Sequence, residues 1–191
     1  MKRIIFSLLI ASFLVACGGE PSLQKYYVEN QDNSEFLMLD VPASLLAGAG
    51  SSLSAEQQEA LETVRKVNLL AYPVKEDGRE KYELERTEVE NILRDEKYQQ
   101  LMRFGGSGTG VQFYYVGNED AIDEFVAYGS DNDRGFMVAR ILGDDMQVDQ
   151  LFNLLESIKP EDVINIPGVK DFGMSLAPKS DSAVAPQDSI E

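Results

Sequence analysis

The sequence has no histidine and no tryptophan, and its one cysteine is Cys17. Without histidine the chain cannot form a Ser-His-Asp triad, a Cys-His pair or a His-based acid–base pair, and a conventional zinc site lacks its ligands. Haem and iron–sulfur clusters lose their usual ligands too. With 191 residues, 43% of them apolar and 9% aromatic, the chain is nevertheless large enough for one domain with a real core.

Basic residues are scarce. The chain has 17 basic and 33 acidic side chains, a net charge of −16, and removal of Lys2 and Arg3 with a signal peptide leaves −18. Such a chain is repelled by the phosphates of nucleic acids and by anionic lipid head groups, so nucleic-acid binding is excluded. The acidic balance leaves three interpretations, which are basic partners, divalent cations, or a solvated surface that keeps an exported protein soluble.

The first residues form an export signal. Lys2 and Arg3 precede an apolar run, residues 4–15, whose helix would rise only about 18 Å, too short for a hydrocarbon core of about 30 Å. The run continues into Leu-Val-Ala-Cys-Gly at residues 14–18, which has the form of a lipobox. The pattern predicts cleavage after Ala16 and acylation of Cys17. An ordinary signal peptide followed by a free cysteine is the alternative.

Acylation at Cys17 would hold the chain at a membrane, because two or three acyl chains anchor a protein almost permanently. No other stretch approaches the length of a membrane span, so the rest of the chain is expected outside the bilayer. The residue after the cysteine is Gly18. It is not the aspartate that retains many lipoproteins in the inner membrane. We therefore expect the outer membrane of a Gram-negative cell, with the leaflet left open.

The remaining pattern predicts one α+β domain over residues 22–176, after a tether at residues 17–21 and before a disordered tail at residues 177–191. We expect a largely antiparallel sheet of about five strands that ends in a three-stranded meander, with helices packed mainly on one face. The expected strands are residues 35–41, 67–74, 111–117, 122–129 and 135–143. The expected helices are residues 22–28, 43–47, 54–66, most of 80–103, and 148–157. Two capping boxes, Ser54 with Gln57 and Thr87 with Glu90, mark helix starts.

Several short stretches after the lipobox also occur, in the same order, in one known protein family. They are Leu-Gln-Lys-Tyr-Tyr at residues 23–27, Val-Pro-Ala-Ser-Leu-Leu at 41–46, Tyr-Gln-Gln-Leu-Met-Arg at 98–103 and Arg-Ile-Leu-Gly-Asp at 140–144. Together they resemble the uncharacterised lipoprotein family catalogued as domain of unknown function 4252, found mainly in Bacteroidota. The resemblance covers roughly residues 22–157 and implies an envelope lipoprotein, without implying any catalytic residue. A glycine-rich loop, residues 105–110, replaces the family's usual charged loop.

Two groups of residues are candidates for binding. Tyr114 and Tyr128 lie among alternating aromatic residues on expected strands, a pattern that ordinary core packing and cross-strand pairing explain, with a platform for a ligand or partner on the outer face as the alternative. Asp131 and Asp133 suggest a calcium loop, but the run lacks the glycine and glutamate positions of an EF-hand, and an Asp- and Asn-rich hairpin turn explains it better.

The tail carries two possible modification sites. Ser182 and Ser189 each follow an aspartate and precede a small or aliphatic residue, which resembles an O-glycosylation acceptor.

These observations favour a non-catalytic binding or regulatory module that acts through protein–protein contacts at the outer membrane, without a cofactor. The alternative is a carboxylate-based hydrolase of envelope glycans or lipids, because paired carboxylates need no histidine. That alternative requires two acidic side chains across a cleft, roughly 5 to 9.5 Å apart.

Overall fold

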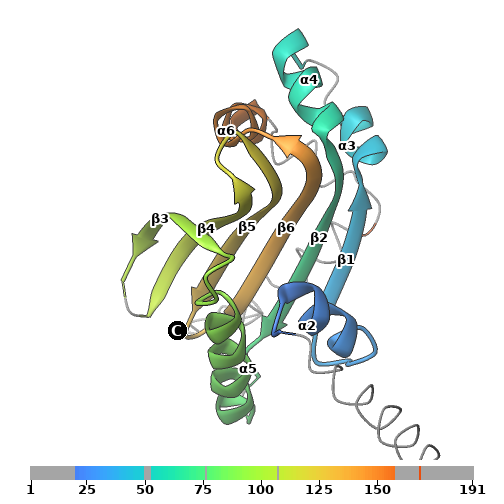
Figure 1. The fold of residues 1–191 in the computed structure, drawn as a ribbon. Coiled ribbons are helices and arrows are strands. Elements are labelled where there is room, and N and C mark those ends of the chain that lie inside the picture. Colours follow the sequence, from blue (N-terminus) through green and yellow to red (C-terminus); the bar gives the residue numbers. More distant parts are fainter. Residues whose placement is uncertain (1–19, 50–52, 76, 107, 158–167, 169–191) are drawn as a thin grey trace, which may run out of the picture.

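The computed structural model describes residues 20–49, 53–75, 77–106, 108–157 and 168. They form one six-stranded antiparallel sheet with five helices around it (Figure 1). The strands are β1 (Leu37–Pro42), β2 (Val64–Pro73), β3 (Gln99–Gly105), β4 (Thr109–Asn118), β5 (Ala121–Asp131) and β6 (Gly135–Met146). The helices are α2 (Leu23–Asn30), α3 (Ala43–Ala49), α4 (Ala55–Thr63), α5 (Arg79–Ile92) and α6 (Val148–Ser157). Within this described part, none of the helices has the length and apolar character needed to span a membrane.

The strands lie in the order β1-β2-β6-β5-β4-β3, so the sheet is open and has β1 and β3 at its edges. The predicted α+β class is confirmed, and the predicted meander of β4, β5 and β6 is present as consecutive antiparallel neighbours. The meander is one strand longer than expected because β3 pairs with β4. Strand β2 pairs with β6 on the other side and carries β1 at its outer edge.

The prediction that most of residues 80–103 are helical is wrong for the second part of that range, which forms strand β3. Helix α5 ends at Ile92, and the chain turns before Gln99 pairs with Tyr115 at the start of the β3–β4 ladder. The apolar spacing of Tyr98, Leu101 and Met102 imitates a helical face, but pairing with the neighbouring strand decides the structure.

The expected helix start at Thr87 is also wrong. Helix α5 runs through Thr87 without a break, and the Thr87 hydroxyl donates to the carbonyl oxygen of Glu83 at 2.6 Å. A Ser or Thr side chain inside a helix bonds back one turn in this way.

Both faces of the sheet carry a hydrophobic cluster, because the strands are apolar on both sides. Val126 belongs to the first cluster and its neighbour Phe125 to the second, and successive side chains of a strand point to opposite faces. Helices α2 and α5 contribute to the first cluster, and α4 and α6 contribute to the second. The helices therefore lie on both faces, which differs from the expected covering of mainly one.

We call the face that carries the first cluster the first face and the opposite one the second face. A row of polar side chains crosses the first face among the apolar residues. Arg140 is 3% exposed and donates from Nε and Nη2 to the two carboxylate oxygens of Glu124, at 2.8 and 3.0 Å. Arg140 faces Asn68 in the β2–β6 register, and the Asn68 amide donates to Asp40 on β1. Gln24 of α2 accepts a further hydrogen bond from Arg140 at 3.2 Å. These hydrogen bonds join β1 to β2, and they join β6 to β5 and to α2, so a shifted register would break them.

Removal of one member of the buried pair should be strongly destabilising. Glu124→Ala leaves the Arg140 charge buried without its partner, which should lower the free energy of unfolding by about 3 to 5 kcal/mol in urea denaturation. The double variant Arg140→Met with Glu124→Leu should lose less stability than Glu124→Ala, since it buries no unpaired charge. A loss in the double variant as large as that of Glu124→Ala would contradict this account.

Candidate functional site

The second face of the sheet is hollow where helices α3, α4 and α6 meet it. A cavity of about 220 Å³ lies there. All of its lining residues are apolar, and they are Val41, Leu46, Leu61, Val64, Val67, Leu69, Phe125, Ala127, Ala139, Ile141, Leu151, Leu154 and Leu155. We call this cavity the apolar pocket.

Two alanines explain why the floor of the apolar pocket is low. Ala127 on β5 and Ala139 on β6 face each other across the strand pair, at the centre of the sheet. Their larger neighbours in the same row are Phe113 on β4 and Leu69 on β2. Since an alanine side chain ends at its Cβ, the pair leaves space that the helices above do not fill.

Helix α4 forms one wall, and its position is fixed at its N-terminus. The capping box at Ser54 is confirmed, because its side chain accepts from the backbone N–H of Gln57 at 3.3 Å and Gln57 Oε1 accepts from the backbone N–H of Ser54 at 2.9 Å. The side-chain amide of Gln57 also donates to the carbonyl oxygen of Asn153, at 3.4 Å, and so joins α4 to α6.

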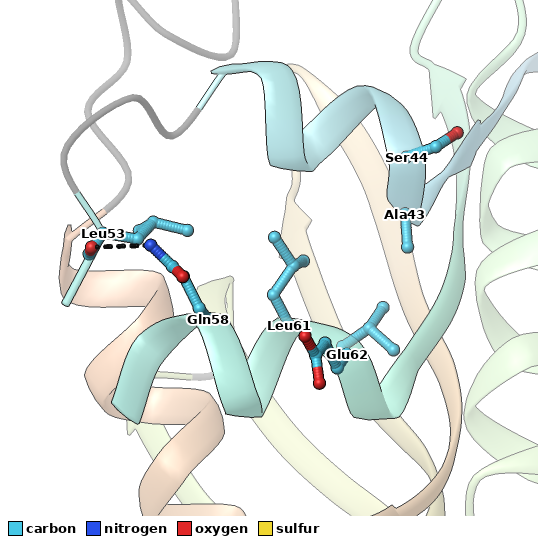
Figure 2. Close-up of a pocket in the computed structure, with 7 residues that line it drawn as sticks. Ala43, Ser44, Leu53, Gln58, Leu61 and Glu62 are labelled. Atoms are coloured by element: carbon cyan, nitrogen blue, oxygen red, sulfur yellow. Dashed lines mark hydrogen bonds between the residues drawn. The ribbon is translucent and has the colours of Figure 1, made fainter. Parts of the chain in front are cut away.

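A second pocket adjoins the first and is more polar. It has a volume of about 440 Å³ and shares Leu61 and Val64 with the apolar pocket. Figure 2 shows Leu61 pointing from α4 toward α3, and it shows Gln58 bonded to the carbonyl oxygen of Leu53, at 3.2 Å. Ser44, Gln58 and Glu62 supply its polar groups. An apolar interior beside a few polar groups is typical of sites that bind apolar ligands or side chains.

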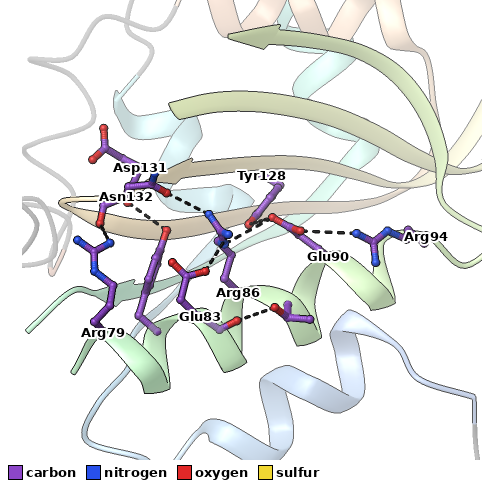
Figure 3. Close-up of polar contacts among 10 residues, drawn as sticks. Arg79, Glu83, Arg86, Glu90, Arg94, Tyr128, Asp131 and Asn132 are labelled. Carbon is purple, nitrogen blue, oxygen red and sulfur yellow. Dashed lines mark hydrogen bonds and ion pairs between the residues drawn. The ribbon is translucent and has the colours of Figure 1, made fainter. Parts of the chain in front are cut away.

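On the first face, α5 is held against the hairpin between β5 and β6 (Figure 3). Arg79 donates to the carbonyl oxygen of Asn132, and Arg86 Nη1 donates to the Asn132 side-chain oxygen at 3.1 Å. The Tyr82 hydroxyl donates to the carbonyl oxygen of Asp131 at 3.0 Å. These contacts tie the helix to the turn.

The acidic residues of this network are paired with arginines. Arg86 lies 2.8 Å from Glu83 and 3.8 Å from Glu90, and Arg94 lies 3.7 Å from Glu90. Glu90 also accepts a hydrogen bond from the Tyr128 hydroxyl at 3.4 Å. The arrangement neutralises its own charges and is a structural network.

The carboxylate oxygens of Asp131 are used by the turn that contains it. One accepts from the backbone N–H groups of Asp133 and Arg134, at 2.9 and 3.0 Å, and the other accepts from the Thr109 hydroxyl at 3.1 Å. The hydrogen bonds from Asp133 and Arg134 lower the pKa of Asp131. The exposed Asp133 carboxylate lies 3.6 Å from Arg79. Among the described residues, no group of three Asp, Glu, Cys or His side chains is placed to hold a metal ion.

Calcium should therefore leave the melting temperature unchanged, because the oxygens of Asp131 already accept hydrogen bonds and Asp133 has Arg79 as its partner. Calorimetry in calcium and in a chelator checks this expectation. A calcium-dependent rise that Asp131→Asn removes would instead establish the site suggested by the sequence.

The tyrosines suggested as an exposed binding face, Tyr114 and Tyr128, are buried instead. Tyr114 is 7% exposed and Tyr128 is 0% exposed, and both belong to the first hydrophobic cluster. Tyr128 packs with Phe136, whose ring centroid lies 6.3 Å away, and the Tyr114 hydroxyl donates to Gln112 at 2.8 Å. Core packing, the alternative considered for this pattern, describes both rings.

Burial raises the pKa of several tyrosines. It raises that of Tyr98 to about 12, with a further contribution from the Glu124 charge. Burial also raises the pKa of Tyr26, whose hydroxyl donates to Glu85 at 2.5 Å, and the pKa of Tyr128, near Glu90. The folded protein thus keeps protons that the unfolded chain releases.

Stability should consequently fall in alkali. It is fully present below pH 10, the ordinary pKa of tyrosine, and is lost as the pH rises from 10 toward 12, since the unfolded state then binds fewer protons. Urea denaturation across this pH range measures the loss of stability. The absorbance of tyrosinate follows the ionisation of the tyrosines, without interference from tryptophan, which the chain lacks. Titration of all tyrosines together near pH 10 in the folded protein would contradict the burial argument.

The hydrolase alternative requires two carboxylates across one cleft. Four pockets lined by described residues each contain at most one carboxylate. The apolar pocket contains none, and the others contain Glu62, Glu88 and Glu90 respectively.

The remaining predicted sites fall outside the described residues. They are the cleavage site at Ala16, the lipid attachment at Cys17, and the glycosylation candidates Ser182 and Ser189. These sites stay predictions.

Sequence reasoning missed the apolar pocket. Its signal is faint and consists of single alanines, Ala127 and Ala139, at central positions of strands that otherwise carry bulky residues. Their significance depends on their facing each other, and only the register shows this.

The fold and the pocket together define an α+β domain built on one open antiparallel sheet, with helices on both faces. The chain belongs to the family described as a domain of unknown function (DUF4252), whose profile matches residues 26–154, more than half of the chain. The predicted family is thereby confirmed. No curated protein and no solved structure matched the chain.

Proposed function

We propose that this chain is a non-catalytic binding module of the cell envelope, anchored by lipid at Cys17 to the outer membrane. Its apolar pocket receives an apolar side chain from a protein partner. The observation that carries this proposal is the lining of the pocket, in which all residues are apolar.

Such a pocket favours binding over chemistry. A reaction needs groups that donate, accept or stabilise charge, and the pocket lining offers none of these. Burial of one Leu, Ile or Phe side chain from a partner would contribute about 1.5 to 3 kcal/mol. An apolar anchor that fills a pocket is the usual centre of a protein–protein interface. The adjoining groups of Ser44, Gln58 and Glu62 supply polar contacts beside it.

The lipid anchor compensates for the small size of the pocket. Acyl chains at Cys17 would confine the domain to a membrane surface, where a partner on the same surface is present at a high effective concentration. A modest contact then suffices for association. The net charge of −18 that remains after removal of Lys2 and Arg3 keeps the domain away from anionic head groups, so it would stand clear of the surface to which it is tied.

The decisive variant fills the pocket. Ala139→Leu adds bulk to the floor and should reduce the yield of a cross-linked partner in intact cells by about tenfold or more, the equivalent of one lost apolar anchor. Ala55→Leu is the matched control, since it makes the same change at an exposed position outside both pockets. Ala127→Val serves as a second filling variant if Ala139→Leu lowers the melting temperature.

The anchor is tested in the same assay. Cys17→Ala should lose the partner as well, because the domain is then no longer confined to the membrane. Recovery of the same partner in unchanged amount from Ala139→Leu would contradict the pocket as the binding site. Normal envelope behaviour of a deletion strain, with no partner recovered, would argue against the module itself.

A further inference from the structure

Strand β3 leaves one edge of the sheet open. It pairs with β4 on one side only and is the outermost strand of the described sheet (Figure 1). Gln99, Gln100, Arg103 and Phe104 of this strand are exposed, and the Phe104 side chain is 60% exposed. Unpaired backbone N–H and C=O groups along such an edge readily pair with another strand.

The two edge strands of the sheet differ in the features that discourage pairing with another strand. Strand β1 carries Asp40 and ends at Pro42, and charge and proline both discourage pairing at an edge. Strand β3 contains no proline, and its single charged residue is Arg103. A register shift between Gln100 and Met102 bends it locally. Of the two edges, β3 is therefore the better template for an added strand.

The charge distribution indicates what kind of partner fits. Between Glu96 and Glu119 the sequence has no acidic residue, although 33 of the 191 residues are acidic. This interval contains the whole β3–β4 hairpin. Two copies of a chain with a net charge of −16 repel each other, and the repulsion is weakest where the facing surfaces carry no carboxylate.

We propose that β3 pairs antiparallel with the β3 of a second copy of this chain, around a twofold axis. The pairing joins two six-stranded sheets into one continuous sheet and satisfies the free edge of both. It also covers Phe104, which packs edge-on against Phe113 with ring centroids 6.3 Å apart. The contact is separate from the apolar pocket, whose lining includes no residue of β3.

Cysteine scanning tests this pairing, because Cys17 is the chain's only cysteine. The full-length variants Gln99→Cys, Gln100→Cys, Leu101→Cys, Met102→Cys and Arg103→Cys are oxidised mildly in intact cells and separated without reductant. Facing residues of an antiparallel pair have Cα atoms about 4.5 to 5.5 Å apart, within the range of a disulfide. We expect a species of twice the mass of the monomer, with one position giving the highest yield and the yield falling on either side.

Two controls accompany the series. Leu84→Cys places a cysteine on α5, where the side chain is 66% exposed, and should give no dimer. The parent chain reports any disulfide formed by Cys17. Adding Arg103→Glu to the best of the four variants at residues 99–102 puts carboxylates on both facing edges and should reduce the dimer by about tenfold or more, whereas Leu84→Glu should leave it unchanged.

Three results would overturn the proposal. One is the absence of a dimer at all five positions, and another is an equal dimer from Leu84→Cys. The third is a disulfide between β3 and a different protein, which would make this edge the docking site of another strand. Ala139→Leu should leave the dimer yield unchanged, so failure of the pocket and failure of the edge pairing are distinguishable.

Discussion

The register of the sheet depends on the polar row in which the buried Arg140 binds Glu124 and the buried Asn68 binds Asp40. In a sheet with one apolar face, a slip of one residue exposes the hydrophobic side chains and is strongly opposed. Here both faces are apolar, so hydrophobicity alone resists a slip only weakly. Directional hydrogen bonds supply the missing specificity, and a buried ion pair that fixes a register is the best-attested use of such a pair. The two clusters and the hollow floor between Ala127 and Ala139 exist only in the register that this row selects.

Local chemistry predicts much of the fold. The capping box at Ser54 and the short connections of the meander each act over a few residues, so the sequence alone shows them. Strand β3 escapes prediction because its identity lies in the hairpin with β4, while Leu101 and Met102 mimic a helical face. The site is less predictable than the fold. A pocket is space between side chains brought together by register, and Tyr128 looks like an exposed ring until α5 is placed over it.

The two faces of the sheet differ in their chemistry. On the first face, α5 and the β5–β6 hairpin are joined by arginines, by Glu90 and by tyrosine hydroxyls, so polar groups there are consumed by the fold itself. On the second face, the cavity between the helices and the sheet is lined by apolar side chains. Directional contacts thus add to hydrophobic packing on the first face, while the second face retains a shape that a partner can fill.

The strand order also has a consequence for how the chain folds as it is made. The meander from β3 to β6 joins neighbours in sequence, but β2 is completed by β6, and Leu70 pairs with Val138 across more than a third of the chain. During synthesis from the N-terminus, β1 and β2 can pair with each other early, but β2 emerges long before its second partner β6, and such non-local pairing is slow. Until residue 146 has emerged, β2 presents an apolar strand with one side unpaired. During this interval the unpaired side of β2 is exposed to pairing with other chains, so the incomplete chain is prone to aggregation.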